Sequence, residues 1–393
     1  AVNLGWLPSY PQFDRNPLKL WEEAAAGTKE EAIRYIAESI KKGELQFAVQ
    51  NPDKMENFPR TMFVWRANLI GSSSKGHEYF LKYLLGTHGH PLGGEPENLS
   101  VSEIENSGET PAGKLDLLVN IDFRMQGTGL YSDIVLPAAT WYEKYDISST
   151  DMHPFIHPFN PAIATPWESR SDWDTFKKLA KRFSELAKKY FPKPIKDVVT
   201  EPLLHDSPAE TAQTFGKIAD WTNGTAELEP GKNFPNIHIV ERDYTKVYDK
   251  FIALGPNIKE TIGTKGISWQ TGKEYRHLLN ILGPAKGTKD YRDMPDLSFE
   301  RNAAEAILTL SSTTNGYLAV KAWESMENVT GLKLKDLAVE RAEEHMSFDE
   351  ITAQPRKVIT SPVYSGTETG NRRYSPFTTN VERLIPWRTL TGR

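Results

Sequence analysis

The first half of the chain predicts an α/β fold with a parallel sheet and helices on both faces. Residues 61–65 alternate apolar side chains and lead through a Gly/Ser-rich turn into a helical pattern. Residues 115–121 (LDLLVNI) are almost continuously apolar, which is typical of a parallel strand covered on both faces. A short apolar run follows at residues 133–136 and is stopped by Pro137. Strand, helix and strand in this order indicate a right-handed crossover unit within one sheet.

The composition is that of an ordinary globular protein. At 393 residues the chain is long enough for two to three domains and a large core. Its net charge of −5 makes nucleic acid an unexpected main partner, and no apolar run is long enough to span a membrane. The chain has no cysteine, which excludes disulfides, thiolate zinc sites and cysteine-ligated iron–sulfur clusters within this stretch.

One helix is predicted before the sheet. Residues 1–27 show little periodicity and are expected to be irregular chain that covers a neighbouring surface. Thr28, followed three residues later by Glu31, predicts a capping box at the start of a helix. The apolar stripe of this helix is formed by Ala32, Ile33, Ile36, Ala37 and Ile40.

A long amphipathic helix is predicted after the sheet. Ser171 and Asp174 mark its start and Pro192 ends it. Residues 139–170, which precede it, contain little regular pattern, and residues 86–113 are expected to form a surface excursion.

The second half of the chain is less informative. Helical patterns occur near residues 246–253, 301–311 and 316–329, separated by long stretches rich in Gly, Pro, Lys and Asp. We therefore expect three parts, namely a leading segment with one helix (1–54), an α/β domain (55–190) and a partly helical extension with an irregular tail (191–393).

The turn between the first strand and the following helix is a candidate phosphate site. Small residues allow a phosphate to approach the backbone, and the helix N-terminus provides free N–H groups and a positive dipole. The hydroxyls and charges available there belong to Arg66, Ser72, Ser73, Ser74 and Lys75. The alternative is an ordinary strand-to-helix turn, because the spacing matches neither GxGxxG nor GxxxxGK[ST].

Other polar residues follow the ends of the predicted strands. Asp122 lies where ligands of open α/β sheets bind and is able to accept hydrogen bonds from a ribose or a base, or else to cap a turn. Arg124 is suited to pair with a phosphate or with Asp122, and Lys144 to reach a phosphate. His153 and His157 are four residues apart, but the adjacent prolines predict an extended segment, which disfavours a metal site.

Several stretches of the sequence together match one known family. They include SDIVLP followed by a W-x-E element, the segment STDMHPFIHP, and the runs WLPSYPQFDRNPL, FVWRANLIGSSSKGHEYFLKYLLGT and NVERLIPWRTLTGR. On these residues the chain resembles the molybdopterin oxidoreductase superfamily, and within it the alpha (catalytic) subunits of respiratory nitrate reductases. The resemblance covers essentially the whole chain.

The resemblance implies a fold, a cofactor and partners. The fold would be a Rossmann-like parallel sheet in three αβα layers with long irregular extensions. Such enzymes hold molybdenum between two molybdopterin guanine dinucleotides (Mo-bis-MGD) and reduce nitrate to nitrite. Electrons come from quinol through iron–sulfur clusters, a beta (iron–sulfur) subunit and a gamma (membrane cytochrome b) subunit, which places the enzyme on the cytoplasmic side of the membrane.

The resemblance also implies which residues line the cofactor. Trp65, Arg66, Asn68, Ser72, Ser73, Ser74 and Lys75 match the family's cofactor loop, and Asp122 and Arg124 match the strand end that contacts guanosine. Lys144, Asp151 and Asp172 match further cofactor-lining positions.

The family's molybdenum and iron–sulfur ligands are expected upstream of this stretch, and a final cofactor-binding domain is expected after Arg393. We therefore expect a middle portion with no catalytic or metal-ligating residue of its own. Taken alone, it would be soluble and inactive, with exposed apolar patches through which it can self-associate.

Two alternative functions remain open at this point. One is a related enzyme, such as a nitrite oxidoreductase or a chlorate or selenate reductase, whose distinguishing residues would lie near the metal. The other is a non-catalytic nucleotide- or glycan-binding module, which the ten tryptophans and the acidic loops suggest.

Overall fold

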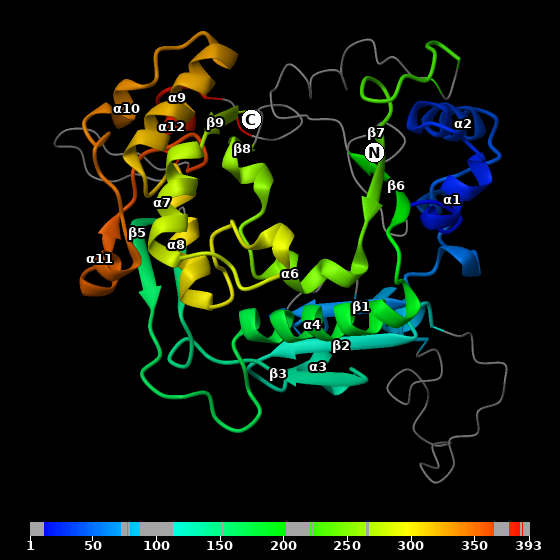
Figure 1. Cartoon of the computed structure of the whole chain (residues 1–393), viewed down its shortest axis with the longest axis horizontal. Coiled ribbons are helices and arrows are strands. Elements are labelled where there is room, and N and C mark those ends of the chain that lie inside the picture. Colours follow the sequence, from blue (N-terminus) through cyan, green and yellow to red (C-terminus); the bar gives the residue numbers. More distant parts are fainter. Residues whose placement is uncertain are drawn as a thin grey trace.

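The first half of the chain forms a three-stranded parallel sheet. The computed structural model describes residues 12–71, 77, 79–86, 113–150, 152–201, 221, 224–264, 267–364, 377–385 and 387. The sheet has the order β1 (Thr61–Trp65), β2 (Leu117–Asp122), β3 (Ile134–Pro137) (Figure 1). Both strand pairs are parallel, so the predicted α/β class and all three predicted strands are confirmed.

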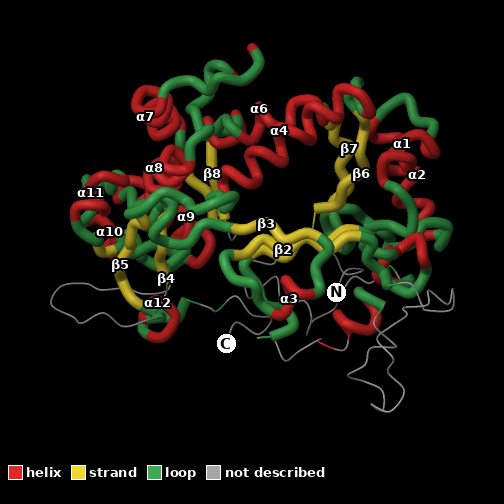
Figure 2. Tube along the Cα trace, turned by 90° about the horizontal axis from the view of Figure 1, so that it is seen from below, coloured by secondary structure: helices red, strands yellow, loops and turns green. Residues whose placement is uncertain are grey.

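Helical segments cover both faces of this sheet. Helix α4 (Asp172–Tyr190) lies on one side of β2 and the short helix α3 (Gly127–Leu130) on the other (Figures 1 and 2). Phe176 of α4 packs against Val119 and Ile121, and Phe80 of the π-helical turn η3 (Tyr79–Leu84) packs on the opposite face. The layered arrangement agrees with the sequence, whereas the Rossmann-like detail stays a prediction.

The N-terminal helices pack on a separate two-stranded sheet. Helix α2 (Lys29–Lys41) has the predicted capping box between Thr28 and Glu31. Together with helix α1 (Pro17–Ala24) it covers the antiparallel pair β6 (Ile195–Glu201) and β7 (Asn236–Arg242). Their shared core contains Phe13, Leu20, Ile36, Phe47, Val198, Phe234 and Ile237.

The prediction that residues 1–27 are irregular is wrong for its second part, where α1 forms. The Asn16 side chain accepts a hydrogen bond from the Leu18 amide at 3.0 Å, and Pro17 occupies the first helical position. Asparagine followed by proline is a recognised helix start, so the signal was present although the helix is too short to show clear periodicity.

Residues 139–170 also contain more regular structure than predicted. Strand β4 (Asp146–Thr150) pairs with β5 (His153–Phe159), which also pairs with β10 (Arg356–Lys357). The prolines in β5 hid the strand, since proline cannot donate to a ladder. A proline carbonyl can still accept a hydrogen bond, and here the Pro154 carbonyl accepts one from the Val358 amide at 2.7 Å.

The C-terminal half is mainly helical. Its elements are α6 (Val247–Phe251), the hairpin β8 (Thr261–Thr264) and β9 (Ile267–Gln270), α7 (Gly272–Leu282), α8 (Glu300–Leu310), α9 (Gly316–Thr330), α10 (Asp336–Val339), α11 (Phe348–Ala353) and α12 (Thr378–Val381). Single 3₁₀ turns of this half cover Tyr244–Lys246, Pro256–Lys259 and Lys289–Tyr291. Two further 3₁₀ turns, Ala48–Gln50 and Met55–Asn57, precede β1. The three predicted helices correspond to α6, α8 and α9, whereas α7 was not predicted. Within the described residues, none of the helices is long and apolar enough to cross a membrane.

Trp323 of α9 anchors the largest apolar core of this half. Its side chain is fully buried, and its Nε1 atom donates to the Thr360 carbonyl at 2.9 Å. We expect Trp323→Ala to lower the free energy of unfolding by about 3–5 kcal/mol, because it leaves a cavity and removes the hydrogen bond from Trp323 to the Thr360 carbonyl. Urea denaturation followed by circular dichroism measures this change.

The matched control is Trp167→Ala, since the Trp167 side chain is 97% exposed. This variant should stay within about 0.5 kcal/mol of the wild-type protein. Equal effects of the two substitutions would contradict the assigned core.

Candidate functional site

The carboxyl ends of the three parallel strands meet at one edge, where ligands of open α/β sheets bind. Trp65 ends β1, and the chain after β3 passes through Ala139. The Ala139 amide donates to the Arg170 carbonyl at 2.7 Å, which aligns the segment leading into α4 beside β3. The Ser171 side chain then caps α4 by accepting from the Asp174 amide at 3.2 Å. The first turn of α4, with Asp172, is thereby fixed at this edge.

The Asp172 carboxylate accepts four side-chain hydrogen bonds. Its Oδ1 atom receives Trp65 Nε1 at 2.7 Å and Arg66 Nε at 2.8 Å. Its Oδ2 atom receives Arg66 Nη2 at 2.7 Å and Lys144 Nζ at 2.8 Å. Burial alone would raise the pKa of Asp172, but the hydrogen bonds from Arg66, Lys144 and Trp65 outweigh it and lower the pKa to about 2. Asp172 is therefore ionised at neutral pH, and we call these four residues the Asp172 network.

Arg66 is held in an unusual backbone conformation, with a φ of +52°. A non-glycine residue in the left-handed region is strained and persists only where its surroundings fix it. Here the guanidinium also donates to the Ala139 carbonyl at 2.8 Å and lies over the Phe123 ring, with Cζ 5.3 Å from the centroid. Among the described residues its Nη1 atom donates no hydrogen bond, so this edge of the guanidinium can bind a ligand.

The Asp172 network lines a cavity of about 390 Å³. Lys144 is nearly buried and also pairs with Asp146 at 2.6 Å. Apolar lining residues include Phe251 and the α8 residues Ala303, Ala304 and Ile307, and Glu300 at the start of α8 also lines the cavity. A cavity of this size, with few polar groups on one wall, is typical of small-molecule sites.

The other predicted residues within the described chain make local contacts. Asp122 accepts from the Phe123 amide at 2.7 Å and from the Arg124 amide at 3.3 Å, which are the contacts of a turn cap. The Arg124 side chain lies against Phe123, with Cζ 5.4 Å from the ring centroid, rather than pairing with Asp122. Asn68 accepts from the Gly71 amide at 2.8 Å.

The structure thus brings four of the predicted site residues into one cluster, namely Trp65, Arg66, Lys144 and Asp172. Asn68, Asp122 and Arg124 belong to neighbouring turns. Ser72, Ser73, Ser74, Lys75 and Asp151 lie outside the described residues.

Two polar residues beside this edge were missed from the sequence. Gln126 donates to the Ala67 carbonyl at 3.0 Å, while its buried Oε1 atom has no partner among the described residues. Asn120 is fully buried, and both atoms of its amide lack a partner in the same part of the chain. An asparagine inside the apolar run 115–121 was the available signal, because buried polar groups normally have hydrogen-bond partners.

The pair His153 and His157 lies on β5, and the two ring centroids are 5.1 Å apart. Within the residues that the structure describes, no three His, Cys, Asp or Glu side chains converge in a way that could hold a metal ion.

Comparison with known proteins relates two parts of the chain to described families. Residues 16–182 match the family model "Molybdopterin oxidoreductase", and residues 260–382 match "Nitrate reductase alpha chain, domain V". The chain is 58% identical over its whole length to the nitrate reductase alpha chain of Bacillus subtilis. It is 48% identical to the respiratory nitrate reductase 2 alpha chain of Escherichia coli and 45% to the nitrate reductase alpha subunit of Mycobacterium tuberculosis, again over its whole length. In each case the chain spans 32% of the relative's own length.

The Asp172 network predicts a pH-dependent stability. We expect Asp172→Asn to lower the free energy of unfolding at neutral pH by about 3 kcal/mol, because it leaves Arg66 without its counter-charge and Lys144 with Asp146 alone. The folded-state pKa of Asp172 is depressed from 3.8 to about 2, so its ionised form stabilises the fold above the unfolded pKa. The difference between wild type and variant should therefore shrink as the pH falls from about 4 towards about 2.

Urea titrations across this pH range measure the difference directly. Asp116→Asn is the control, because the Asp116 side chain is 57% exposed and pairs with Arg60 at the surface. Its effect should stay below about 1 kcal/mol. A difference between wild type and Asp172→Asn that does not change with pH would show that the ionised carboxylate does not stabilise the fold.

Proposed function

Because the chain belongs to the nitrate reductase alpha-chain family of the molybdopterin oxidoreductases, we propose that it forms part of a catalytic subunit that reduces nitrate to nitrite. The proposed cofactor is Mo-bis-MGD, with an iron–sulfur cluster bound outside this stretch. Electrons derived from quinol would arrive through a beta iron–sulfur subunit and a gamma membrane subunit. The observation that supports this proposal most directly is the identity to nitrate reductase alpha chains over the whole chain, at 45–58%.

The role proposed for this stretch is to bind the guanine-nucleotide end of the cofactor. The residues fit such a group in three respects. Trp65 has a half-exposed indole for stacking. Within the part of the chain that the structure describes, the Arg66 Nη1 donor and the buried Gln126 Oε1 acceptor have no hydrogen-bond partner. When bound, the cofactor supplies oxygen-atom transfer at its molybdenum, while the residues of this chain bind and orient its nucleotide end.

Asp172 would act on this site through its neighbours. Its carboxylate holds the Arg66 guanidinium by two parallel hydrogen bonds and fixes the Lys144 ammonium between itself and Asp146. The cavity therefore carries donors in fixed directions but no excess of positive charge, because three carboxylates (Asp146, Asp172 and Glu300) line it beside these two cations. A phosphate would bind at the free edge of Arg66, and Asp172 would remain a positioning residue.

The nearest alternative is another oxidoreductase of this branch, such as a nitrite oxidoreductase or a chlorate or selenate reductase. We favour nitrate reduction because the matched relatives named above are all nitrate reductase alpha chains or subunits. A non-catalytic nucleotide- or glycan-binding module is disfavoured by the two family matches.

In the full-length subunit, we expect Arg66→Ala to lower the retained molybdenum and guanine nucleotide about tenfold, with a parallel loss of nitrate reduction. Arg66→Lys should lie between this variant and the wild type, because an ammonium keeps the charge but not the two parallel hydrogen bonds. Metal analysis and chromatography of the released nucleotide measure the loss. Arg60→Ala removes an arginine from an exposed ion pair and serves as the control. Full cofactor content in Arg66→Ala would refute the proposed binding role.

The purified 393-residue chain should produce no nitrite from nitrate with reduced benzyl viologen, since the proposed metal ligands lie elsewhere. Calorimetry on the same chain should detect GMP or GDP but no response to a panel of sugars. Nitrite formation would contradict the first expectation, and sugar binding without nucleotide binding would favour the glycan-binding alternative.

A further inference from the structure

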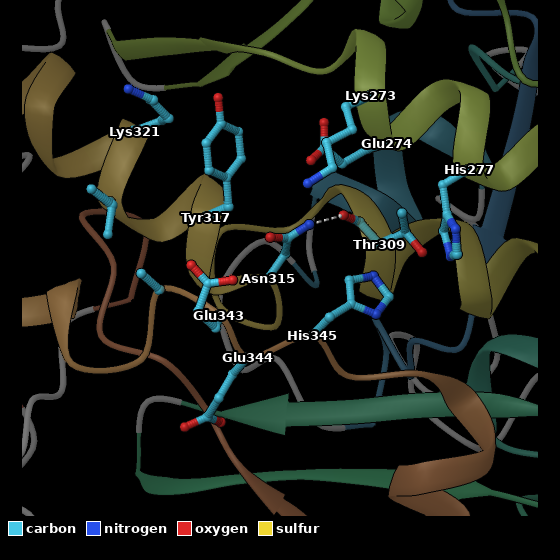
Figure 3. Close-up of a pocket in the computed structure, with 12 residues that line it drawn as sticks. Lys273, Glu274, His277, Thr309, Asn315, Tyr317, Lys321, Glu343, Glu344 and His345 are labelled. Atoms are coloured by element: carbon cyan, nitrogen blue, oxygen red, sulfur yellow. Dashed lines mark hydrogen bonds between the residues drawn. The ribbon is translucent and has the colours of Figure 1, made fainter.

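A second cavity, of about 530 Å³, lies in the C-terminal half, away from the sheet edge. Its walls come from the first turns of α7 and α9, the end of α8 and the segment 342–345 (Figure 3). The lining side chains are mostly polar, and they include Glu274, His277, Thr309, Tyr317, Glu343 and His345.

Three residues of the lining each contain a buried polar atom that has no hydrogen-bond partner among the described residues. These atoms are Glu274 Oε2, Thr309 Oγ1 and His345 Nε2. Glu274 is 5% exposed and Thr309 only 1%. Leaving such groups unpaired costs free energy, most of all for a carboxylate, so three of them beside one cavity indicate a missing ligand.

The walls of the cavity are fixed by backbone contacts. The Gly316 amide donates to the Glu344 carbonyl at 2.7 Å, and the Met346 amide donates to the Thr314 carbonyl at 2.9 Å. A Cβ atom at Gly316 would lie 1.8 Å from the Arg341 carbonyl oxygen, so only glycine allows this approach. The cavity is therefore a built feature of the fold, because the backbone of its walls is held in place.

The charges on the lining favour a cation. Apart from the two histidines, the cavity has three carboxylates (Glu274, Glu343 and Glu344) and two ammonium groups (Lys273 and Lys321). One of these carboxylates, Glu344, forms an ion pair with Arg341, and one of the ammonium groups, Lys321, forms an ion pair with Glu324, both partners lying outside the lining. Lys273 and Lys321 both lie at the Tyr317 ring, 5.5 and 5.7 Å from its centroid. The lining as a whole has one more carboxylate than ammonium group.

The two histidines of the lining, His277 and His345, are compatible with a bound cation. His277 and His345 lie edge to face with their centroids 5.5 Å apart, and Figure 3 shows them on the side of the cavity away from Lys321. Burial, together with His277, lowers the pKa of His345, so its imidazole is neutral at physiological pH. A neutral imidazole can accept a hydrogen bond at Nε2.

We propose that this cavity binds a small organic cation that carries an ammonium or guanidinium group, held by Glu274 and Glu343 and hydrogen-bonded to Thr309 and His345. The N–H groups of such a ligand satisfy the unpaired acceptors, and its hydrocarbon part contacts Val320 and Ala342. This site is independent of the nucleotide site proposed at the sheet edge.

Calorimetry on the 393-residue chain tests the proposal with 1,4-diaminobutane and guanidine as probes and uncharged 1,4-butanediol as the reference. We expect at least one cationic probe to bind and butanediol not to bind. Glu274→Gln should weaken binding about tenfold or more, because it removes the charged acceptor. Glu340→Gln, which removes a carboxylate from the exposed surface of the same region, should leave binding unchanged.

Thermal unfolding of the same variants separates binding from a structural role. Glu274→Gln should not lower the melting temperature, since the substitution removes a buried carboxylate oxygen that has no partner. Thr309→Val keeps the shape of the side chain and should weaken binding several-fold without loss of stability. Failure of both cations to bind the wild type, equal binding of butanediol, or unchanged binding in both cavity variants would overturn the proposal.

Discussion

The Asp172 carboxylate is the contact that unites the central part of this molecule. It joins the end of β1, the segment after β3 and the first turn of α4, which are far apart in the sequence. Burying these charges costs desolvation free energy, and a buried ion pair of this kind adds little net stability compared with apolar packing. The main effect of the Asp172 carboxylate is to fix the geometry of its neighbours. Four charge-assisted or indole hydrogen bonds converge on two oxygen atoms, and this fixes the directions of the remaining donors at the sheet edge.

The strained backbone of Arg66 follows from the same constraint. A left-handed conformation in an arginine is tolerated because Asp172, Ala139 and the Phe123 ring all fix the guanidinium. The strain turns the side chain back over the carboxyl ends of the strands instead of letting it continue along β1. Sites held by packed strands and a capped helix are more precise than sites on loops alone, and the Asp172 network has this property.

The sequence was sufficient for the parts of the fold that have a strong local signal. Apolar runs located β1, β2 and β3, and capping residues located α2 and α4. It failed where the local signal was weak or misleading, as in the short α1, the proline-containing β5 and α7. The site shows the same division. Trp65, Arg66, Lys144 and Asp172 were identified one by one from a family resemblance, but their mutual hydrogen bonds depend on strand register and on the placement of α4. No local pattern encodes contacts across 106 positions, such as that between Arg66 and Asp172.

Helix α8 separates the two cavities and explains why they differ chemically. Ala303, Ala304 and Ile307 face the cavity at the sheet edge, whereas Thr309 faces the second cavity. The helix is fixed at its start and in its middle, since Glu300 accepts from the Tyr145 amide and Glu305 from the Phe348 amide, each at 2.8 Å. No charged residue lines both cavities. The charges at the sheet edge are compensated within the protein, whereas the Glu274 carboxylate retains a buried oxygen without a partner among the described residues. The two cavities therefore share a helical wall but no charged residue.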